Sequence, residues 1–107
     1  MQSGGLARAA HKICELRRQV PNCLVFDNGD FLQGAPICDL AAIGALGPID
    51  SNPIVLAMNE VGYDAVGLGN HEFDYGLPAL TNMLSAARFP VICSNANTSN
   101  QPWQSDQ

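Results

Sequence analysis

The stretch Tyr63–Asn70, "YDAVGLGN", places a short apolar run directly before a glycine and an asparagine. A run of this kind, closed by turn-forming residues, is typical of a strand buried on both faces of a sheet. Cys23–Asp30, "CLVFDNGD", has the same form, and Pro90–Asn95, "PVICSN", follows later in the chain. The sequence therefore predicts three buried strands, and the first two are followed by polar loops.

Helical patterns alternate with these strands. Apolar residues at spacings of three and four, interrupted by turn formers and prolines, predict four helices. The first two helices are expected over Leu6–Val20 and from about Pro36. The third is expected from Pro53 to Gly62, with a cap at Ser51 and Asn52 and a buried stripe of Ile54, Met58 and Val61. The fourth is expected from about Pro78 to before Pro90, with a stripe of Leu77, Leu80, Leu84 and Ala87. Alternating strands and helices favour an α/β fold, in which crossover helices connect parallel strands.

Composition narrows the class of protein. The 107 residues suffice for one small domain, and 14% charged residues is low for a free-standing one, which suggests surface that something else covers. No apolar run is long enough for a transmembrane helix, so no membrane partner is expected. The N-terminal segment alternates charged and apolar residues and does not have the pattern of a signal peptide.

The formal net charge of -5 is distributed unevenly. Four of the five Lys and Arg residues lie within the first 20 positions: Arg8, Lys12, Arg17 and Arg18. The pattern predicts that they, and His11, lie on the solvated face of the first helix. A nucleic-acid interface needs basic groups that follow a phosphate backbone, often with aromatic residues between them. The sequence has no such arrangement, and no nucleic-acid partner is predicted.

The four cysteines show no C-x-x-C spacing, which argues against a zinc knuckle or a thioredoxin-type motif. They are Cys14, Cys23, Cys38 and Cys93. Cys23 and Cys93 lie at or in apolar runs, where a free thiol behaves as a small apolar side chain. Buried free thiols are the favoured interpretation, and disulfide pairing is the alternative.

Two polar clusters, residues 27–30 and 70–74, follow predicted strands. Since ligands of α/β sheets gather at the carboxyl ends of the strands, the two clusters are expected to meet at one edge of the sheet. Asp30 then becomes a candidate ligand of a divalent cation, with Asp27 as the turn former and the amide of Asn70 as a neutral oxygen ligand. The alternative is that both clusters are ordinary turns.

His71 and Asp74 form the candidate proton-transfer pair. Their spacing of three residues is about one helical turn, so the carboxylate can accept the imidazole N–H and raise the pKa of the imidazole. Glu72 points elsewhere under the same geometry and is interpreted as a supporting or structural residue. The alternative for His71 is an ordinary surface histidine. Together, these features favour a metal-assisted hydrolase.

Two longer motifs carry a resemblance to a known family. The segments Phe26–Pro36, "FDNGDFLQGAP", and Met58–Gly76, "MNEVGYDAVGLGNHEFDYG", closely resemble the calcineurin-like metallophosphoesterases of the 5′-nucleotidase type. The nearest branch is that of the bacterial 2′,3′-cyclic-nucleotide 2′-phosphodiesterase/3′-nucleotidases, and the similarity runs from about Gly5 to Asn95. The resemblance implies part of a metallophosphoesterase sandwich and a two-metal hydrolase of nucleotide phosphate esters.

The resemblance also implies roles for individual residues. Asp30 would bridge two divalent ions, such as manganese or zinc, and Asn70 would ligate the second ion. His71, oriented by Asp74, would stabilise the transition state or protonate the leaving oxygen while a metal-activated hydroxide attacks phosphorus in line. Gln33 receives no role. The substrate partner would be a nucleotide, and family members of this kind are periplasmic or exported.

The sequence departs from the family pattern at both ends. The family begins with a strand ending in Asp-x-His, and later adds further histidine ligands and a C-terminal domain that grips the nucleoside; none of these is present here. Residues 1–95 are therefore expected to be a partial catalytic domain, and residues 96–107 an irregular tail. Alternatives within the family are 5′-nucleotidase, UDP-sugar hydrolase or a related thiohydrolase, and outside it an inactive remnant without catalysis of its own.

Overall fold

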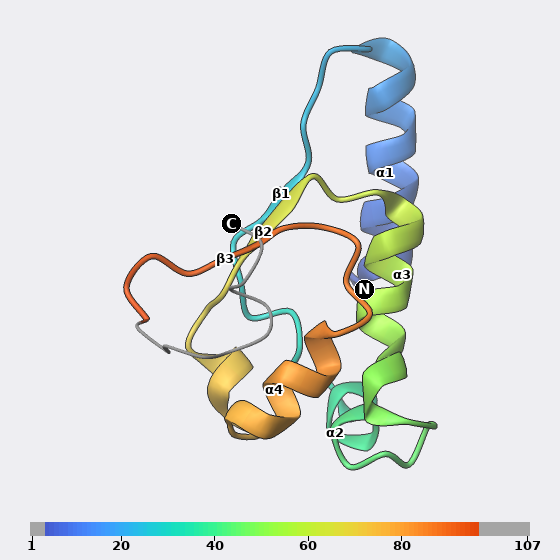
Figure 1. Ribbon diagram of the computed structural model, residues 1–107. Coiled ribbons are helices and arrows are strands. Elements are labelled where there is room, and N and C mark those ends of the chain that lie inside the picture. Colours follow the sequence, from blue (N-terminus) through green and yellow to red (C-terminus); the bar gives the residue numbers. More distant parts are fainter. Residues whose placement is uncertain (1–3, 97–107) are drawn as a thin grey trace.

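The computed structural model describes residues 4–96 as helices around a small parallel sheet (Figure 1). The predicted tail, residues 96–107, lies outside the described residues except for Ala96. The elements in chain order are α1 (Leu6–Gln19), β1 (Phe26–Asp27), α2 (Pro36–Ala42), η1 (Ile49–Ser51), α3 (Pro53–Val61), β2 (Ala65–Gly67), η2 (His71–Phe73), α4 (Leu77–Leu84) and β3 (Val91–Ile92).

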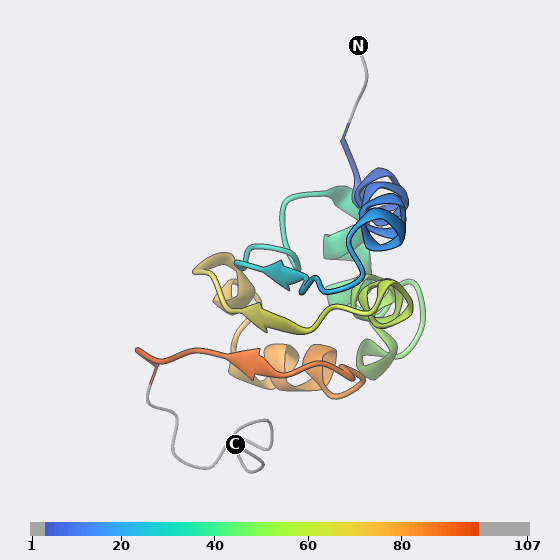
Figure 2. The same cartoon turned by 90° about the horizontal axis from the view of Figure 1, so that it is seen from above.

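The three strands lie in the order β1-β2-β3 and both pairs are parallel, as the alternating pattern predicted. The register pairs Phe26 with Ala65 and Val66 with Val91. Seen from above, the strands lie side by side with β2 in the middle (Figure 2). All three carboxyl ends therefore point to the same edge of the sheet, which is where the polar loops begin.

The helix α1 ends at Gln19, just before Pro21, as predicted. The guanidinium of Arg17 reaches across to α3 and donates hydrogen bonds to the carbonyl oxygens of Val61 and Gly62. Arg17 therefore satisfies carbonyls at the end of α3 that have no partner within that helix. The prediction that all four basic residues of this segment only face solvent was wrong for Arg17, because its long side chain can cover a neighbouring helix end.

The helix α3 begins and ends at the residues that the sequence indicated. The side chain of Asn52 accepts hydrogen bonds from the backbone N–H groups of Ile54 and Val55, and Gly62 ends the helix in the left-handed conformation at φ 79°. The buried face is centred on Val55 and Met58. Of the predicted stripe, Met58 is fully buried, and Ile54 and Val61 are partly buried, with Ile54 packed against the core; the buried residue Val55 was not predicted.

We expect Asn52→Ala to lower the free energy of unfolding by about 1 kcal/mol, because the substitution removes the helix cap. Asn52 is 1% exposed, and its Nδ2 has no hydrogen-bond partner within residues 4–96, so loss of that buried group offsets part of the cost. Urea unfolding followed by circular dichroism measures the change. Ser51→Ala, at the exposed neighbouring position, is the matched control, and an equal effect of both substitutions would contradict the capping role.

The apolar core lies between the sheet and the helices α3 and α4. Its most deeply buried members are Leu32, Val55, Met58, Val66, Leu80 and Met83, each at most 1% exposed. Leu32 comes from the loop after β1, and Val66 is the central residue of β2. The core thus anchors both segments that lead into the polar edge of the sheet.

The first strand differs from its prediction. Leu24 and Phe26 are 70% and 64% exposed, although the apolar run predicted a strand buried on both faces. The strand order explains the difference, because β1 lies at the edge of the sheet, and residues 4–96 place no strand on the side of β1 that faces away from β2. The helix α4 also ends earlier than predicted, at Leu84, so that Ala87 lies beyond it.

The four cysteines are free thiols, as favoured by their spacing. Only Cys38 is buried, whereas Cys23 and Cys93 are partly exposed and Cys14 is exposed. The prediction of burial was therefore wrong for Cys14, and only partly met at Cys23 and Cys93, because these residues lie on an exposed helix face and near the sheet edges. Within residues 4–96, no helix has the length and apolar character needed to cross a lipid bilayer.

Candidate active site

The two polar clusters meet at the carboxyl edge of the sheet, as predicted. The parallel register of β1 and β2 brings the loop after Asp27 beside the segment after Gly67. The backbone N–H of His71 donates to Oδ1 of Asp30 at 3.1 Å, although 41 residues separate them in sequence. The sheet therefore joins Asp30 to the segment that contains Asn70, His71 and Asp74.

The backbones of the two loops are in close contact at two glycines. A Cβ atom added to Gly29 would lie 2.3 Å from the backbone nitrogen of Gly69, and one added to Gly69 would lie 2.2 Å from Oδ1 of Asp30. Gly29 has φ 100° and Asp30 has φ 63°. Glycine is thus required at Gly29 and Gly69 for steric reasons, and Asp30 adopts a left-handed backbone that non-glycine residues rarely occupy.

Asp27 and Asp30 have different environments, in line with the roles expected for them. The Oδ1 atom of Asp27 accepts a hydrogen bond from the backbone N–H of Gly29 at 2.9 Å, which is the geometry of an Asx turn. Asp30 is exposed, and only its Oδ1 accepts a hydrogen bond within the described chain. Its other carboxylate oxygen remains available to a ligand from solvent.

His71 and Asp74 form a close pair on the protein surface. Nδ1 of His71 lies 2.8 Å from Oδ2 of Asp74, and the two side chains are 47% and 42% exposed. The hydrogen bond to Asp74, followed by the negative charge of that carboxylate, raises the pKa of His71 above its ordinary value; Asp30 and Glu72 act in the same direction and desolvation acts against it. Because the carboxylate of Asp74 accepts the Nδ1 proton, Nε2 is the ring nitrogen left to interact with another group.

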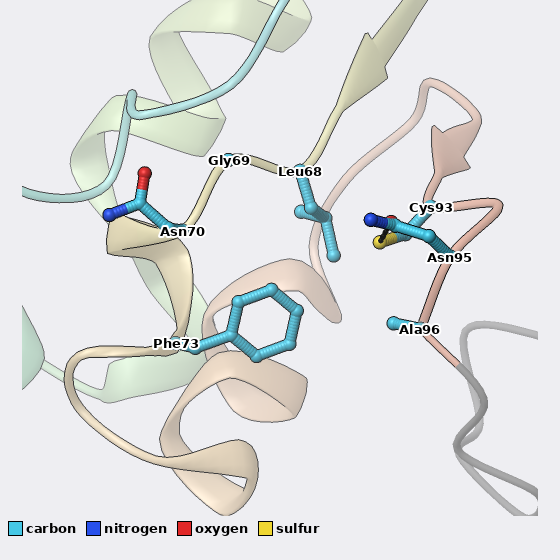
Figure 3. A pocket seen from close by; sticks show the side chains of 7 residues that line it. All are labelled: Leu68, Gly69, Asn70, Phe73, Cys93, Asn95 and Ala96. Atoms are coloured by element: carbon cyan, nitrogen blue, oxygen red, sulfur yellow. Dashed lines mark hydrogen bonds between the residues drawn. The ribbon is translucent and has the colours of Figure 1, made fainter.

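Asn70 borders a pocket of about 430 Å³ at the carboxyl ends of β2 and β3. Asn70 is exposed and its side chain makes no hydrogen bond within the described chain. Figure 3 shows Asn70 and Phe73 on one side of the pocket and Cys93, Asn95 and Ala96 on the other. Figure 3 also shows that the amide of Asn70 is turned away from the other lining residues, so its oxygen is available to a ligand outside the pocket.

Two interactions at the site were not predicted from the sequence. Glu72 is fully buried, and its carboxylate accepts hydrogen bonds from the backbones of both loops. The hydroxyl of Tyr75 donates to Oδ1 of Asp39 on α2 at 2.5 Å, and loss of hydration followed by this hydrogen bond raises the pKa of Tyr75 to about 12. The bonds to Asp30, Leu32 and Asp39 are not apparent from sequence spacing, because they span 42, 40 and 36 residues.

The donor chemistry of Asp30 and Asn70 suits a hard divalent cation, which prefers carboxylate and amide oxygens. Two such side chains are fewer than the three or four protein ligands that a catalytic ion normally has. Within residues 4–96, no three His, Cys, Asp or Glu side chains gather so as to hold a metal ion. The described residues thus fit part of a metal centre.

The chain is similar to known nucleotide phosphoesterases. It is 43% identical over 91 residues to the 2′,3′-cyclic-nucleotide 2′-phosphodiesterase/3′-nucleotidase of Salmonella typhimurium, a match that covers 85% of this chain and 14% of the relative. The 5′-nucleotidase of Homo sapiens is 40% identical over 93 residues, covering 86% of this chain and 15% of that protein. No protein-family model matches the chain.

The comparison with solved structures also finds a phosphoesterase. The crystal structure of the calcineurin-like phosphoesterase YfkN from Bacillus subtilis matches with a TM-score of 0.76 at 42% sequence identity, over 86% of this chain and 29% of that one. The chain spans about one seventh of the length of the curated relatives named above. By sequence and by fold, the chain is a homologue of one segment of the calcineurin-like phosphoesterases of the nucleotidase type.

Proposed function

We propose that the chain forms part of the catalytic domain of a metal-dependent hydrolase of nucleotide phosphate esters, with 2′,3′-cyclic nucleotides and 3′-nucleotides as substrates of the whole protein. The observation that carries the proposal is the contact between Asp30 and His71, which brings a candidate metal ligand beside a histidine–carboxylate pair. Residues 1–95 belong to this domain in the proposal. The similarity to nucleotidases supports the substrate class and an exported or periplasmic location.

In this proposal, Asp30 and Asn70 contribute oxygen ligands to two divalent ions such as manganese or zinc. Both side chains are exposed and have free oxygen atoms at one edge of the sheet. When bound, such ions polarise the phosphoryl group and activate water for in-line attack. The remaining ligands, and the groups that grip the nucleoside, would come from parts of the protein outside this chain, which spans 14% of its Salmonella relative.

His71 is the proposed proton donor to the leaving oxygen. Asp74 holds Nδ1 of the ring, which leaves Nε2 of this half-exposed side chain to donate to the leaving oxygen of the substrate. The raised pKa of His71 increases the protonated fraction near neutral pH, which suits a general acid. Asp74 then acts by orienting the ring and by stabilising its charged form.

A second candidate function is 5′-nucleotidase activity, which the 40% identity to the human 5′-nucleotidase favours. The bond between Asp30 and His71 serves either substrate equally, since both reactions cleave a phosphate ester. Specificity depends on the contacts to the nucleoside, which lie outside the described residues. The two candidates are therefore distinguished by measured substrate preference.

A chimera tests the proposal directly. Residues 5–95 of this chain would replace the aligned segment of the Bacillus subtilis homologue, which has the same local fold. We expect hydrolysis of 2′,3′-cyclic AMP and 3′-AMP that requires manganese or zinc and disappears with a chelator. Adding 5′-AMP extends the panel to a third phosphate ester; because the nucleoside contacts of the chimera come from the Bacillus protein, the second candidate is distinguished by the substrate preference of the whole protein that contains this chain.

The controls separate loss of fold from loss of function. Circular dichroism and thermal unfolding verify that each chimera is folded, and the unmodified Bacillus protein is assayed alongside. The 107-residue chain alone, titrated with manganese in the same assay, is expected to show no turnover because its ligand set is partial. A folded chimera that binds metal but hydrolyses none of the three substrates would contradict the proposal and favour an inactive remnant.

A further inference from the structure

Glu72 is unusual among the acidic residues of the chain because it is fully buried. Among the described residues, the buried polar or charged side chains are Glu72, at 0% exposed, and Asn52, at 1%. A carboxylate is costly to bury unless hydrogen bonds replace its hydration. The position of Glu72, between His71 and Phe73 in η2, places this buried group directly beneath the exposed candidate site.

The carboxylate of Glu72 is satisfied entirely by backbone groups of the two site loops. Oε2 accepts hydrogen bonds from the N–H groups of Asp30 and Gly69, each at 2.7 Å. Oε1 accepts a third from the N–H of Leu32 at 3.1 Å. One side chain thus bonds to the loop after β1 at two points and to the loop after β2 at one point.

A second set of contacts runs in the opposite direction. The side chain of Asp30 accepts from the backbone N–H of His71, while the backbone N–H of Asp30 donates to Glu72. Glu72 therefore holds the main chain of Asp30, and the preceding residue, His71, holds its side chain. This reciprocal arrangement opposes the tendency of Asp30 to leave its left-handed backbone at φ 63°.

The contacts of Glu72 are more specific than burial alone requires. Its three donors include the amides of Asp30 and of Gly69, which immediately precedes Asn70. These two loops carry the candidate ligands, and the contact of Gly29 with Gly69 leaves no space for a side chain between them. The separation of the two ligand-bearing backbones therefore depends on the carboxylate that links them.

We propose that Glu72 is the positioning residue of the site, whose buried carboxylate links the loop of Asp30 to the loop of Asn70 and sets the separation of these two oxygen ligands. The inference rests on the proposed function in so far as Asp30 and Asn70 bind metal. Glu72 itself contacts neither metal nor substrate. Its effect on metal affinity comes from the geometry it imposes, as is common for groups that orient metal ligands.

The test uses the 107-residue chain labelled for NMR. In the wild type, couplings across hydrogen bonds are expected between the side-chain carboxyl carbon of Glu72 and the amide nitrogens of Asp30, Leu32 and Gly69. Manganese titration, followed by paramagnetic broadening near Asp30 and Asn70, reports the metal affinity. The first measurement needs no variant, and the second needs no catalysis.

Glu72→Gln is the informative substitution, because it preserves shape and replaces one accepting oxygen by an amide NH2 group, which only donates. We expect faster amide exchange at one or more of Asp30, Leu32 and Gly69, together with a loss of manganese affinity of roughly 10-fold or more. The control is Val55→Ala, which alters a fully buried core residue of α3. The manganese affinities of the two variants are compared after each has been corrected for the unfolded fraction that follows from its unfolding free energy.

Each outcome decides one part of the inference. Couplings in the wild type, with metal affinity reduced in Glu72→Gln and unchanged in Val55→Ala, support positioning. Equal metal affinity in both variants overturns it, as does the absence of couplings. If the wild type binds no manganese, the metal-binding part of the proposed function fails, and the same result overturns the positioning of metal ligands. Couplings would then still demonstrate the link between the loops.

If Glu72→Gln does not fold, the same comparison is made with Glu72→Asp, which retains two accepting oxygens on a side chain one methylene shorter. Unchanged metal affinity in that variant overturns positioning.

Discussion

His71→Ala is expected to lower kcat of the chimera by roughly 100- to 10,000-fold, the range typical for loss of a general acid. The ring of His71 is held by Asp74 at 2.8 Å and is 47% exposed, so its removal takes away the proposed proton donor without disturbing the core or the backbone bond to Asp30. KM is expected to change little, because the ring acts on the leaving oxygen during bond cleavage. Steady-state kinetics with 3′-AMP measure both constants.

Two comparisons make this result specific. His11→Ala removes the other histidine of the chain, an exposed residue of α1, and should leave kcat unchanged. A substrate with a better leaving group, such as a nitrophenyl phosphate ester, should be less sensitive to His71→Ala, because it needs less protonation. Equal losses with both substrates would indicate that His71 acts in another way than as a proton donor.

Gly29→Ala is expected to cause a large loss of stability. The new Cβ would lie 2.3 Å from the backbone nitrogen of Gly69 and 2.7 Å from its Cα, so one of the two loops must move. Crowding of this kind costs about 1–3 kcal/mol, and the left-handed backbone at φ 100° adds about 1–2 kcal/mol. Urea unfolding of the 107-residue chain measures the sum.

Gly34→Ala is the matched control for this substitution. Gly34 also has a positive φ, at 117°, but a Cβ added there would meet no atom within 4 Å. The control therefore carries the backbone strain without the collision. We expect Gly29→Ala to be more destabilising than Gly34→Ala by the crowding contribution, and equal losses would show that the close approach of the loops is not maintained in solution.

The sequence predicted those parts of the fold that depend on neighbouring residues. Pro21 follows the end of α1, Asn52 caps α3, and Gly62 ends it, because each of these signals acts within one turn of the chain. The meeting of the two polar loops was also predictable, since parallel strands place their carboxyl ends at a common edge. The hydrogen bond from the backbone N–H of His71 to Asp30 confirms this part of the prediction.

Features that depend on distant partners could not be predicted in the same way. The exposure of Phe26 follows from the edge position of β1, which an apolar run does not encode. The bond from Arg17 to the end of α3 spans 44 residues, and the bonds from Asp30 and Leu32 to Glu72 span 42 and 40. A glutamate in a short glycine-bounded polar segment has the pattern of a surface position, and only the packed structure places Glu72 inside.

The long sequence separation of the Glu72 bonds has a consequence for the order of folding. Contacts between residues about 40 positions apart form only when the entropy of closing the intervening loop has been overcome. The hydrogen bonds within helices such as α1 and α3 carry no such cost. Asp30 and Asn70 stand on opposite sides of this loop closure, so a chain in which the two loops have not met does not present the two oxygen ligands together.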